Sequence, residues 1–321
     1  IVGHWKDADV QNEISSWVRA AVGWYESNNL SVARFGDNMR NVAVTEGDKV
    51  GVELAMGIHV DGFGVGELAR VVSDVSEDNV RNLVEEYGEY YLITDEVWSN
   101  ESAMESIKGQ ARLELGIRTF LETNGYSAFT TTYEDLHGLE QLPGMAVQRL
   151  MEDGFGFGAE GDWKQAALVR IMKSMAYGLP GGTSFMEDYT YHMEPSQEMV
   201  LGAHMLEVCP SIAVSDVKPK VEVHSLDIGG KRAPARLVFD GDGGDAVNVS
   251  LVDMGNRLRL IVNTVKTYRP KKEMPKLPVA RVLWKPMPDF KTGIESWILS
   301  GGAHHTGFST ALSLKQIVDF A

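Results

Sequence analysis

Two glutamates and two histidines of this 321-residue chain occur where such side chains are costly or unusual. Glu160 lies in the glycine-rich stretch "GFGAEG", and Glu187 lies in the strand-like run of "GGTSFMEDYTYH", which is rich in Tyr and Thr. His204 interrupts the apolar segment "MVLGAHMLEVCPS", and His305 lies in the turn "SGGAHHTGFS". Two carboxylates and two imidazoles together suit a borderline divalent cation, with Mn²⁺ favoured over Zn²⁺, because structural zinc prefers thiolates. Spacing along the chain does not show that the four converge.

Each of these residues also has an ordinary structural explanation. Glu160 precedes Asp162, which can cap a following helix, and an acid is favoured near the positive end of a helix. A lone histidine such as His204 in an apolar strand is more often a hydrogen-bonded core residue than a ligand. His304 and His305 are adjacent, so at most one of them is an obvious ligand.

The two neighbouring acids of "GGTSFMEDYTYH" pose a separate problem. Strand alternation places Glu187 on one face with Tyr189 and Tyr191, and Asp188 on the other. If one face is buried, one acid is buried too, which is expensive unless it is paired or binds a metal. An edge strand with both faces solvated is the alternative.

Three motifs resemble known sites but fail their structural requirements. Residues 156–161 satisfy G-x-G-x-x-G, yet the segment upstream is helical in pattern and Glu160 would oppose a pyrophosphate. "DGDGGD" has Leu251 where the bidentate acid of a calcium loop belongs. "GTSFM" lacks the final glycine of a nucleophile elbow. Dinucleotide binding, a calcium loop and a serine hydrolase therefore have little support.

The elements that must position these residues change character along the chain. Up to about residue 180, helix-like and strand-like segments alternate, which predicts an α/β domain with a Rossmann-like or flavodoxin-like parallel sheet. The first helix, over 7–29, is amphipathic, and its apolar residues at helical spacing are Val10, Ile14, Trp17, Val18 and Ala21. Further helices are expected at 76–91, 111–125 and 142–154, and strands at 30–39 and 127–133.

Beyond about residue 180, strand-sized segments follow one another with turns such as "DGDGG" between them. This pattern predicts an all-β domain whose antiparallel hairpins close into a barrel or a sandwich, and we expect the barrel. The expected strands are 221–226, 235–240, 246–253, 257–265, 280–284 and 296–300. We therefore expect a leading helix over 1–30, the α/β domain over 31–180 and the barrel domain over 181–321.

The bulk composition narrows the classes of partner. The hydrophobic fraction of 44% and charged fraction of 23% are typical of a globular protein. A formal net charge of −15 argues against nucleic acid, and no apolar run predicts a membrane span. The single cysteine, Cys209, excludes an internal disulfide framework and favours a reducing compartment, so we expect the cytoplasm.

The segments around these residues resemble the L-arabinose isomerase family over essentially the whole chain. The resemblance implies an enzyme that interconverts L-arabinose and L-ribulose, and D-galactose and D-tagatose, through a cis-enediol. It further implies a Mn²⁺ ion, with Co²⁺ or Mg²⁺ as substitutes, held by Glu160, Glu187, His204 and His305, the two glutamates also acting as the acid/base pair. The motifs that carry it are "ARFGDNMRNVAVTEGDKV", "FTTTYEDLHGLEQLPGMAVQRLM", "GFGAEGDWKQAALVRIMK", "GGTSFMEDYTYH", "LGAHMLEVCPSIA", "LPVARVLWKP" and "WILSGGAHHTGFS".

The resemblance also implies sugar contacts at Met39, Tyr133 and Ile228. The family usually has Phe where Tyr133 stands, so a hydroxyl is expected beside the sugar. Relative to the family, the chain is expected to lack the N-terminal domain apart from its last helix, 1–30, and the C-terminal end. The family forms trimers or hexamers, which implies a homo-oligomer. The alternative is a non-catalytic remnant that binds metal or sugar.

Overall fold

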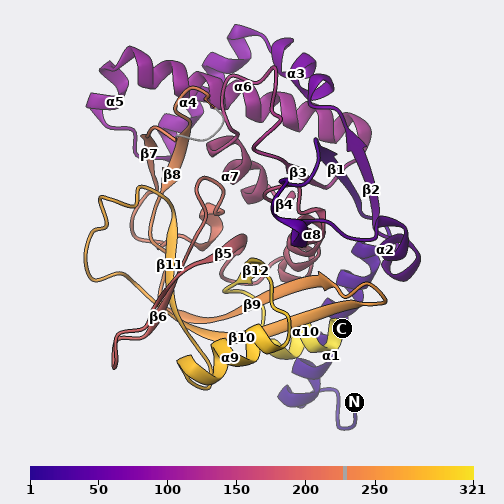
Figure 1. Ribbon diagram of the computed structural model, residues 1–321. Coiled ribbons are helices and arrows are strands. Elements are labelled where there is room, and N and C mark those ends of the chain that lie inside the picture. Colours follow the sequence, from indigo (N-terminus) through magenta and orange to yellow (C-terminus); the bar gives the residue numbers. More distant parts are fainter. Residues whose placement is uncertain (227–229) are drawn as a thin grey trace.

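The computed structural model describes residues 1–226 and 230–321 (Figure 1). Ile228, one of the expected sugar contacts, lies outside the described residues. Within those two ranges, no helix has the length and apolar character needed to cross a membrane. The described chain forms a parallel sheet with helices, followed by a closed antiparallel barrel, as the sequence predicts.

The first half is built on a four-stranded parallel sheet in the order β2-β1-β3-β4. The strands are β1 (Ser31–Phe35), β2 (His59–Phe63), β3 (Ala128–Thr131) and β4 (Gly156–Gly158). The associated helices are η1 (Ala43–Thr45), α2 (Lys49–Met56), α3 (Val65–Ser73), α4 (Glu77–Tyr90), α5 (Asp95–Ser99), α6 (Glu101–Asn124), α7 (Met145–Glu152) and α8 (Trp163–Ala176). Helix α8 touches both the sheet and barrel strands, so it joins the two halves of the molecule (Figure 1).

Local chemistry explains where the long helices begin and end. Ser76 accepts a hydrogen bond from the backbone of Asn79 at the start of α4, and Asn100 caps α6 in the same way. Helix α6 ends at Gly125, whose φ of 76° is a left-handed conformation that glycine adopts without strain. Helix α4 matches the prediction of 76–91, whereas the prediction of 111–125 misses the first ten residues of α6, which Asn100 caps.

The second half contains a closed barrel in the order β10-β11-β6-β5-β12-β9. Its strands are β5 (Thr183–His192), β6 (Met199–Ala203), β9 (Gly244–Asp253), β10 (Leu258–Tyr268), β11 (Arg281–Pro286) and β12 (His305–Ser309). The predicted strands at 221–226 and 235–240 exist as β7 (Lys220–Val223) and β8 (Ala235–Val238), but they form a separate two-stranded sheet. A short turn of helix, η2 (Pro210–Ile212), follows β6.

The second half is not all-β, and the strand predicted at 296–300 is wrong. That run ends helix α9 (Phe290–Leu299), and a last helix, α10 (Leu314–Phe320), closes the chain. Asp289 starts α9 by accepting a hydrogen bond from the backbone of Thr292 at 2.9 Å. A short apolar run does not distinguish strand from helix by itself, and here the upstream cap decides the outcome.

The leading helix α1 (Ala8–Ser27) forms as predicted, but most of its apolar stripe faces solvent. Ile14 is 44% exposed and Trp17 is 64% exposed. The buried side instead carries small residues, and it packs on α8 and α10. A Cβ atom at Gly23 would lie only 2.8 Å from the Met175 side chain, so close helix approach requires a small residue there.

Another close approach, inside the barrel wall, yields a stability prediction. A Cβ atom at Gly202 of β6 would lie 1.7 Å from the ring of Trp284, which is buried on β11. We expect Gly202→Ala to lower the free energy of unfolding by about 1–3 kcal/mol through overpacking. Urea denaturation measures this change. The control is Gly244→Ala on β9, where an added Cβ meets nothing within 4 Å; equal losses in both variants would refute the packing argument.

Candidate metal centre

Three adjacent barrel strands bring three of the predicted ligands to one place. Glu187 of β5 lies opposite His305 of β12 on one side and opposite Ala203 of β6 on the other. His204 directly follows Ala203 at the end of β6. Directly opposed residues of antiparallel strands have Cβ atoms about 4.5–5.5 Å apart, so this register juxtaposes side chains that are distant in sequence.

The fourth predicted ligand comes from the other half of the molecule. Glu160 lies in the turn between β4 and α8, at the carboxyl end of the parallel sheet where such folds commonly bind ligands. Helix α8 packs directly against β5 and β12. A Cβ atom at Gly307, close to His305, would lie 2.6 Å from the sulfur of Met172 on α8, so a glycine permits this contact.

The glycines of "GFGAEG" serve this junction. The upstream segment is helix α7, as predicted, but the first glycines form strand β4, which the sequence pattern did not indicate. Cβ atoms at Gly156 and Gly158 would lie 2.2 and 2.3 Å from the carbonyl oxygens of Ala166 and Asp162. The motif therefore allows a strand and the following helix to pack closely.

Of the four predicted ligands, Glu160, His204 and His305 form a tight cluster, and Glu187 lies at its edge. One ligand atom from each of Glu160, His204 and His305 lies within 4.8 Å of the others. The Glu160 Oε2 atom is 3.7 Å from His305 Nε2, and Glu187 Oε2 is 4.0 Å from His204 Nε2. His304, the other histidine of the pair, also approaches, with Nε2 at 3.7 Å from Glu160 Oε2.

Two atoms of the cluster are buried without a hydrogen-bond partner. They are Glu160 Oε2 and His305 Nε2. Buried polar atoms in native proteins are almost always satisfied, so an orphaned oxygen and an orphaned nitrogen close together are suited to bind a ligand. A divalent cation accepts electron pairs from both kinds of atom, and mixed carboxylate and imidazole donors suit Mn²⁺ and its neighbours. The residues present therefore fit a metal ion.

Asp162 orients His305. The imidazole Nδ1 donates to Asp162 Oδ2 at 3.2 Å, while Oδ1 of the same carboxylate accepts from the backbone of Gln165 and caps α8. Burial lowers the pKa of His305, which favours the neutral ring. With the proton on Nδ1, the lone pair is on Nε2 and faces Glu160. This carboxylate–imidazole arrangement is the one that orients metal-binding histidines.

Glu207 does the same for His204. The imidazole Nδ1 donates to Glu207 Oε2 at 2.5 Å, and both residues are buried. Burial opposes a charge on His204, but the Glu207 carboxylate outweighs it and raises the pKa of His204 to about 8. Sequence reasoning missed Glu207. The available signal was an acid three residues after a candidate histidine, in "HMLE".

The backbone of Glu160 is strained. Its φ is 60°, one of two positive values among the non-glycine residues that the structure describes. Its carbonyl accepts a hydrogen bond from the backbone N–H of Met39 at 3.0 Å, which holds the turn. A left-handed conformation costs an L-residue about 1–2 kcal/mol, and such strain is concentrated at functional sites. Glycine would be the unstrained choice here.

This strain predicts an unusual order of stabilities. We expect Glu160→Gly to have a free energy of unfolding about 1 kcal/mol above that of Glu160→Ala, since only alanine keeps the left-handed penalty. The matched control is Glu122, in the last turns of α6, where the alanine variant should be the more stable by about 1 kcal/mol. Denaturant titration of the metal-free variants measures both differences. The same order at the two positions would contradict strain at Glu160.

Met39 and Tyr133 lie beside the cluster. Met39 is half-buried and packs on the core of the α/β half, next to the Glu160 turn. Tyr133 is 4% exposed, and its ring stacks near that of His204 with centroids 6.2 Å apart. Its hydroxyl donates to Glu207 Oε1 at 3.0 Å. The extra hydroxyl is therefore engaged in a buried hydrogen bond.

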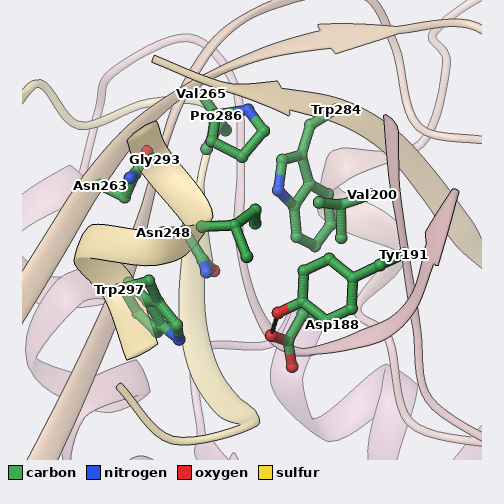
Figure 2. A pocket seen from close by; sticks show the side chains of 11 residues that line it. Asp188, Tyr191, Val200, Asn248, Asn263, Val265, Trp284, Pro286, Gly293 and Trp297 are labelled. Atoms are coloured by element: carbon green, nitrogen blue, oxygen red, sulfur yellow. Dashed lines mark hydrogen bonds between the residues drawn. The ribbon is translucent and has the colours of Figure 1, made fainter. Parts of the chain in front are cut away.

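Asp188 does not belong to the cluster, and the predicted strand alternation is wrong around it. The β5–β6 register shifts between Glu187 and Thr190, which lets Asp188 and Tyr191 hydrogen-bond on one side of the strand. Figure 2 shows both lining a small pocket with Asn248 and Trp284. Burial raises the pKa of Asp188 to about 6. The two adjacent acids thus have separate surroundings.

A parallel α/β half and an antiparallel barrel that jointly form a buried carboxylate–imidazole cluster define a class of candidate metalloproteins. Comparison with known proteins gives the particular family. Residues 31–178 match the L-arabinose isomerase central domain, and residues 182–321 match the L-arabinose isomerase C-terminal domain.

The relatives agree with the domain matches. The chain is 59% identical over its full length to the L-arabinose isomerase of Geobacillus stearothermophilus and 56% identical to those of Thermotoga neapolitana and Bacillus subtilis. The chain therefore belongs to the L-arabinose isomerase family. It spans 64% of the length of each of these three curated relatives.

Proposed function

We propose that this chain carries the metal site and the acid/base groups of an aldose–ketose isomerase acting on L-arabinose, and also on D-galactose. The observation that carries the proposal is the convergence of Glu160, Glu187, His204 and His305, with two orphaned ligand atoms, in a chain 59% identical to a relative named L-arabinose isomerase. Met39 and Tyr133, beside the cluster, are proposed to form the wall against which the sugar lies.

The cluster is proposed to hold Mn²⁺, with Co²⁺ or Mg²⁺ as substitutes. Glu160 Oε2, His204 Nε2 and His305 Nε2 would hold the ion, and Glu187, 4.0 Å from His204 Nε2, would complete the ligand set. When bound, the ion would stabilise negative charge on the sugar oxygens. Asp162 and Glu207 hold the imidazole rings with their lone pairs directed at the ion.

The two glutamates are proposed to move the protons. A carboxylate takes the proton from C2 of the open-chain aldose while the C1 carbonyl oxygen gains a proton, which gives a cis-enediol. A proton is then returned to C1 and the C2 hydroxyl releases one, leaving a ketone at C2. Burial opposes ionisation of Glu160, but the imidazole of His304, 3.7 Å from Oε2, and those of His305 and His204 lower its pKa. Glu160 is thus ionised at neutral pH and able to act as the base.

The direct test is ketose formation from L-arabinose by the chelator-stripped chain, with and without added Mn²⁺. We expect no L-ribulose without the ion and restored formation with it. Mn²⁺ binding without any ketose would contradict catalysis by this chain and favour a binding role. Absence of Mn²⁺ binding in calorimetry would contradict the metal site itself.

Adjacent acids on one strand supply a matched pair of variants. Glu187→Gln removes a charge beside His204 and should weaken Mn²⁺ binding at least tenfold and abolish ketose formation. Asp188→Asn removes the neighbouring charge, which lies in the barrel pocket, and should leave Mn²⁺ affinity within about twofold (Figure 2). Calorimetry and the ketose assay measure both. Equal losses in the two variants would show that Glu187 has no special role.

A further inference from the structure

Tyr133 makes contacts that a sugar-binding residue does not need. Its hydroxyl donates to Glu207 Oε1 at 3.0 Å, and its oxygen lies 3.3 Å from His204 Nδ1. Tyrosine, glutamate and histidine are all buried, with exposures of 4%, 2% and 2%. Tyr133 and Glu207 thus form one closed hydrogen-bond network with the proposed metal ligand His204, on the Nδ1 side of its ring.

The network fixes the orientation of the Glu207 carboxylate. The hydroxyl of Tyr133 occupies Oε1, while Oε2 accepts from His204 Nδ1 at 2.5 Å and from the backbone N–H of Leu206 at 3.0 Å. A carboxylate bonded through both oxygens cannot rotate freely without breaking one of these bonds. Oε2 therefore stays directed at His204 Nδ1, and the proton stays on that nitrogen.

The consequence reaches the cluster through the imidazole ring. In its neutral form, which is the form that binds a metal, His204 carries its proton on Nδ1 and presents the lone pair of Nε2 toward Glu160 and His305. Without the tyrosine hydroxyl, Glu207 Oε1 would lose this buried donor. The carboxylate could then rotate, and both the ring angle and the tautomer of His204 would be less strictly defined.

We propose that Tyr133 is a positioning residue: its hydroxyl locks Glu207, which in turn sets the tautomer and ring angle of the metal ligand His204. The metal part of this inference rests on the proposed function. In this proposal the Tyr133 hydroxyl supports the metal ligand through Glu207. The sugar would contact only the aromatic ring, as it would contact the ring of a phenylalanine.

The first test is Tyr133→Phe, which removes one oxygen and keeps the ring. Calorimetry of the chelator-stripped chain with Mn²⁺, without sugar, should show about tenfold weaker binding. With Mn²⁺ saturating, KM for L-arabinose should stay within about twofold of the parent value. An unchanged Mn²⁺ affinity with a raised KM would show that the hydroxyl contacts the sugar, and would overturn the proposal.

The matched control is Tyr87→Phe. Tyr87 is fully buried, and its hydroxyl donates at 2.8 Å to the buried carboxylate of Glu114. The other hydrogen-bond partners of Glu114 are Arg118 and Arg149, which do not belong to the cluster. Both variants lose a buried hydroxyl–carboxylate bond, so both should lose stability. Only Tyr133→Phe should change Mn²⁺ affinity. Equal changes in the two variants would assign the effect to general destabilisation and overturn the proposal.

A second readout needs neither metal nor activity. In metal-free protein labelled with ¹⁵N-histidine and recorded at about pH 10, where the His204 ring is neutral, its two ring nitrogens report its tautomer. Their signals are identified by their loss in His204→Asn. Tyr133→Phe should move these shifts away from the parent values, and Tyr87→Phe should not. Unmoved His204 shifts in Tyr133→Phe would refute the proposal even if the parent chain bound no metal. A parent chain that formed no ketose would contradict only the proposed function.

Discussion

The pairing of β5 with β6 on one edge and β12 on the other is the constraint on which the centre depends. That register sets Glu187 opposite His305 and beside His204. Because side chains alternate along a strand, a shift of one residue in either ladder would turn a ligand to the opposite face. Closure of the barrel leaves β5 no free edge, so both ladders hold the register together.

Docking of α8 on these strands brings Glu160 to the same place. Its position there is energetically unfavourable in two local respects. The Glu160 backbone is left-handed, and one of its oxygens is buried without a partner. Asp162 compensates by linking the helix cap to His305 in one side chain. Asp162 therefore stabilises the start of α8 and orients His305 with the same carboxylate.

Much of the fold follows from signals within short segments. The cap at Ser76 and the glycine after α6 mark helix ends, and apolar alternation marks most barrel strands. The start of α6 at Asn100 lies ahead of the predicted helix 111–125, because the apolar periodicity is weaker there than the cap. The strand predicted at 296–300 failed because the decisive cap, Asp289, lies upstream of the apolar run. The exposed stripe of α1 could not be predicted, since the spacing of apolar residues does not say which face of a helix a neighbour will cover.

The candidate metal centre, like the fold, was predictable in part. Glu160, Glu187, His204 and His305 could be singled out because charged or imidazole groups in glycine-rich or apolar surroundings are conspicuous. The convergence of these four residues could not be predicted from the sequence, because it depends on strand register and on the docking of α8. The register shift after Glu187, which sets Asp188 beside Tyr191 and not on the opposite face from it, could not be predicted for the same reason. Local sequence reports residue types, whereas long-range pairing determines which of them meet.

An anomalous difference map from crystals of the chain saturated with Mn²⁺, recorded near the manganese edge, would locate the ion directly. We expect one strong peak enclosed by Glu160, Glu187, His204 and His305. A peak bound elsewhere, with none among these four side chains, would contradict this expectation.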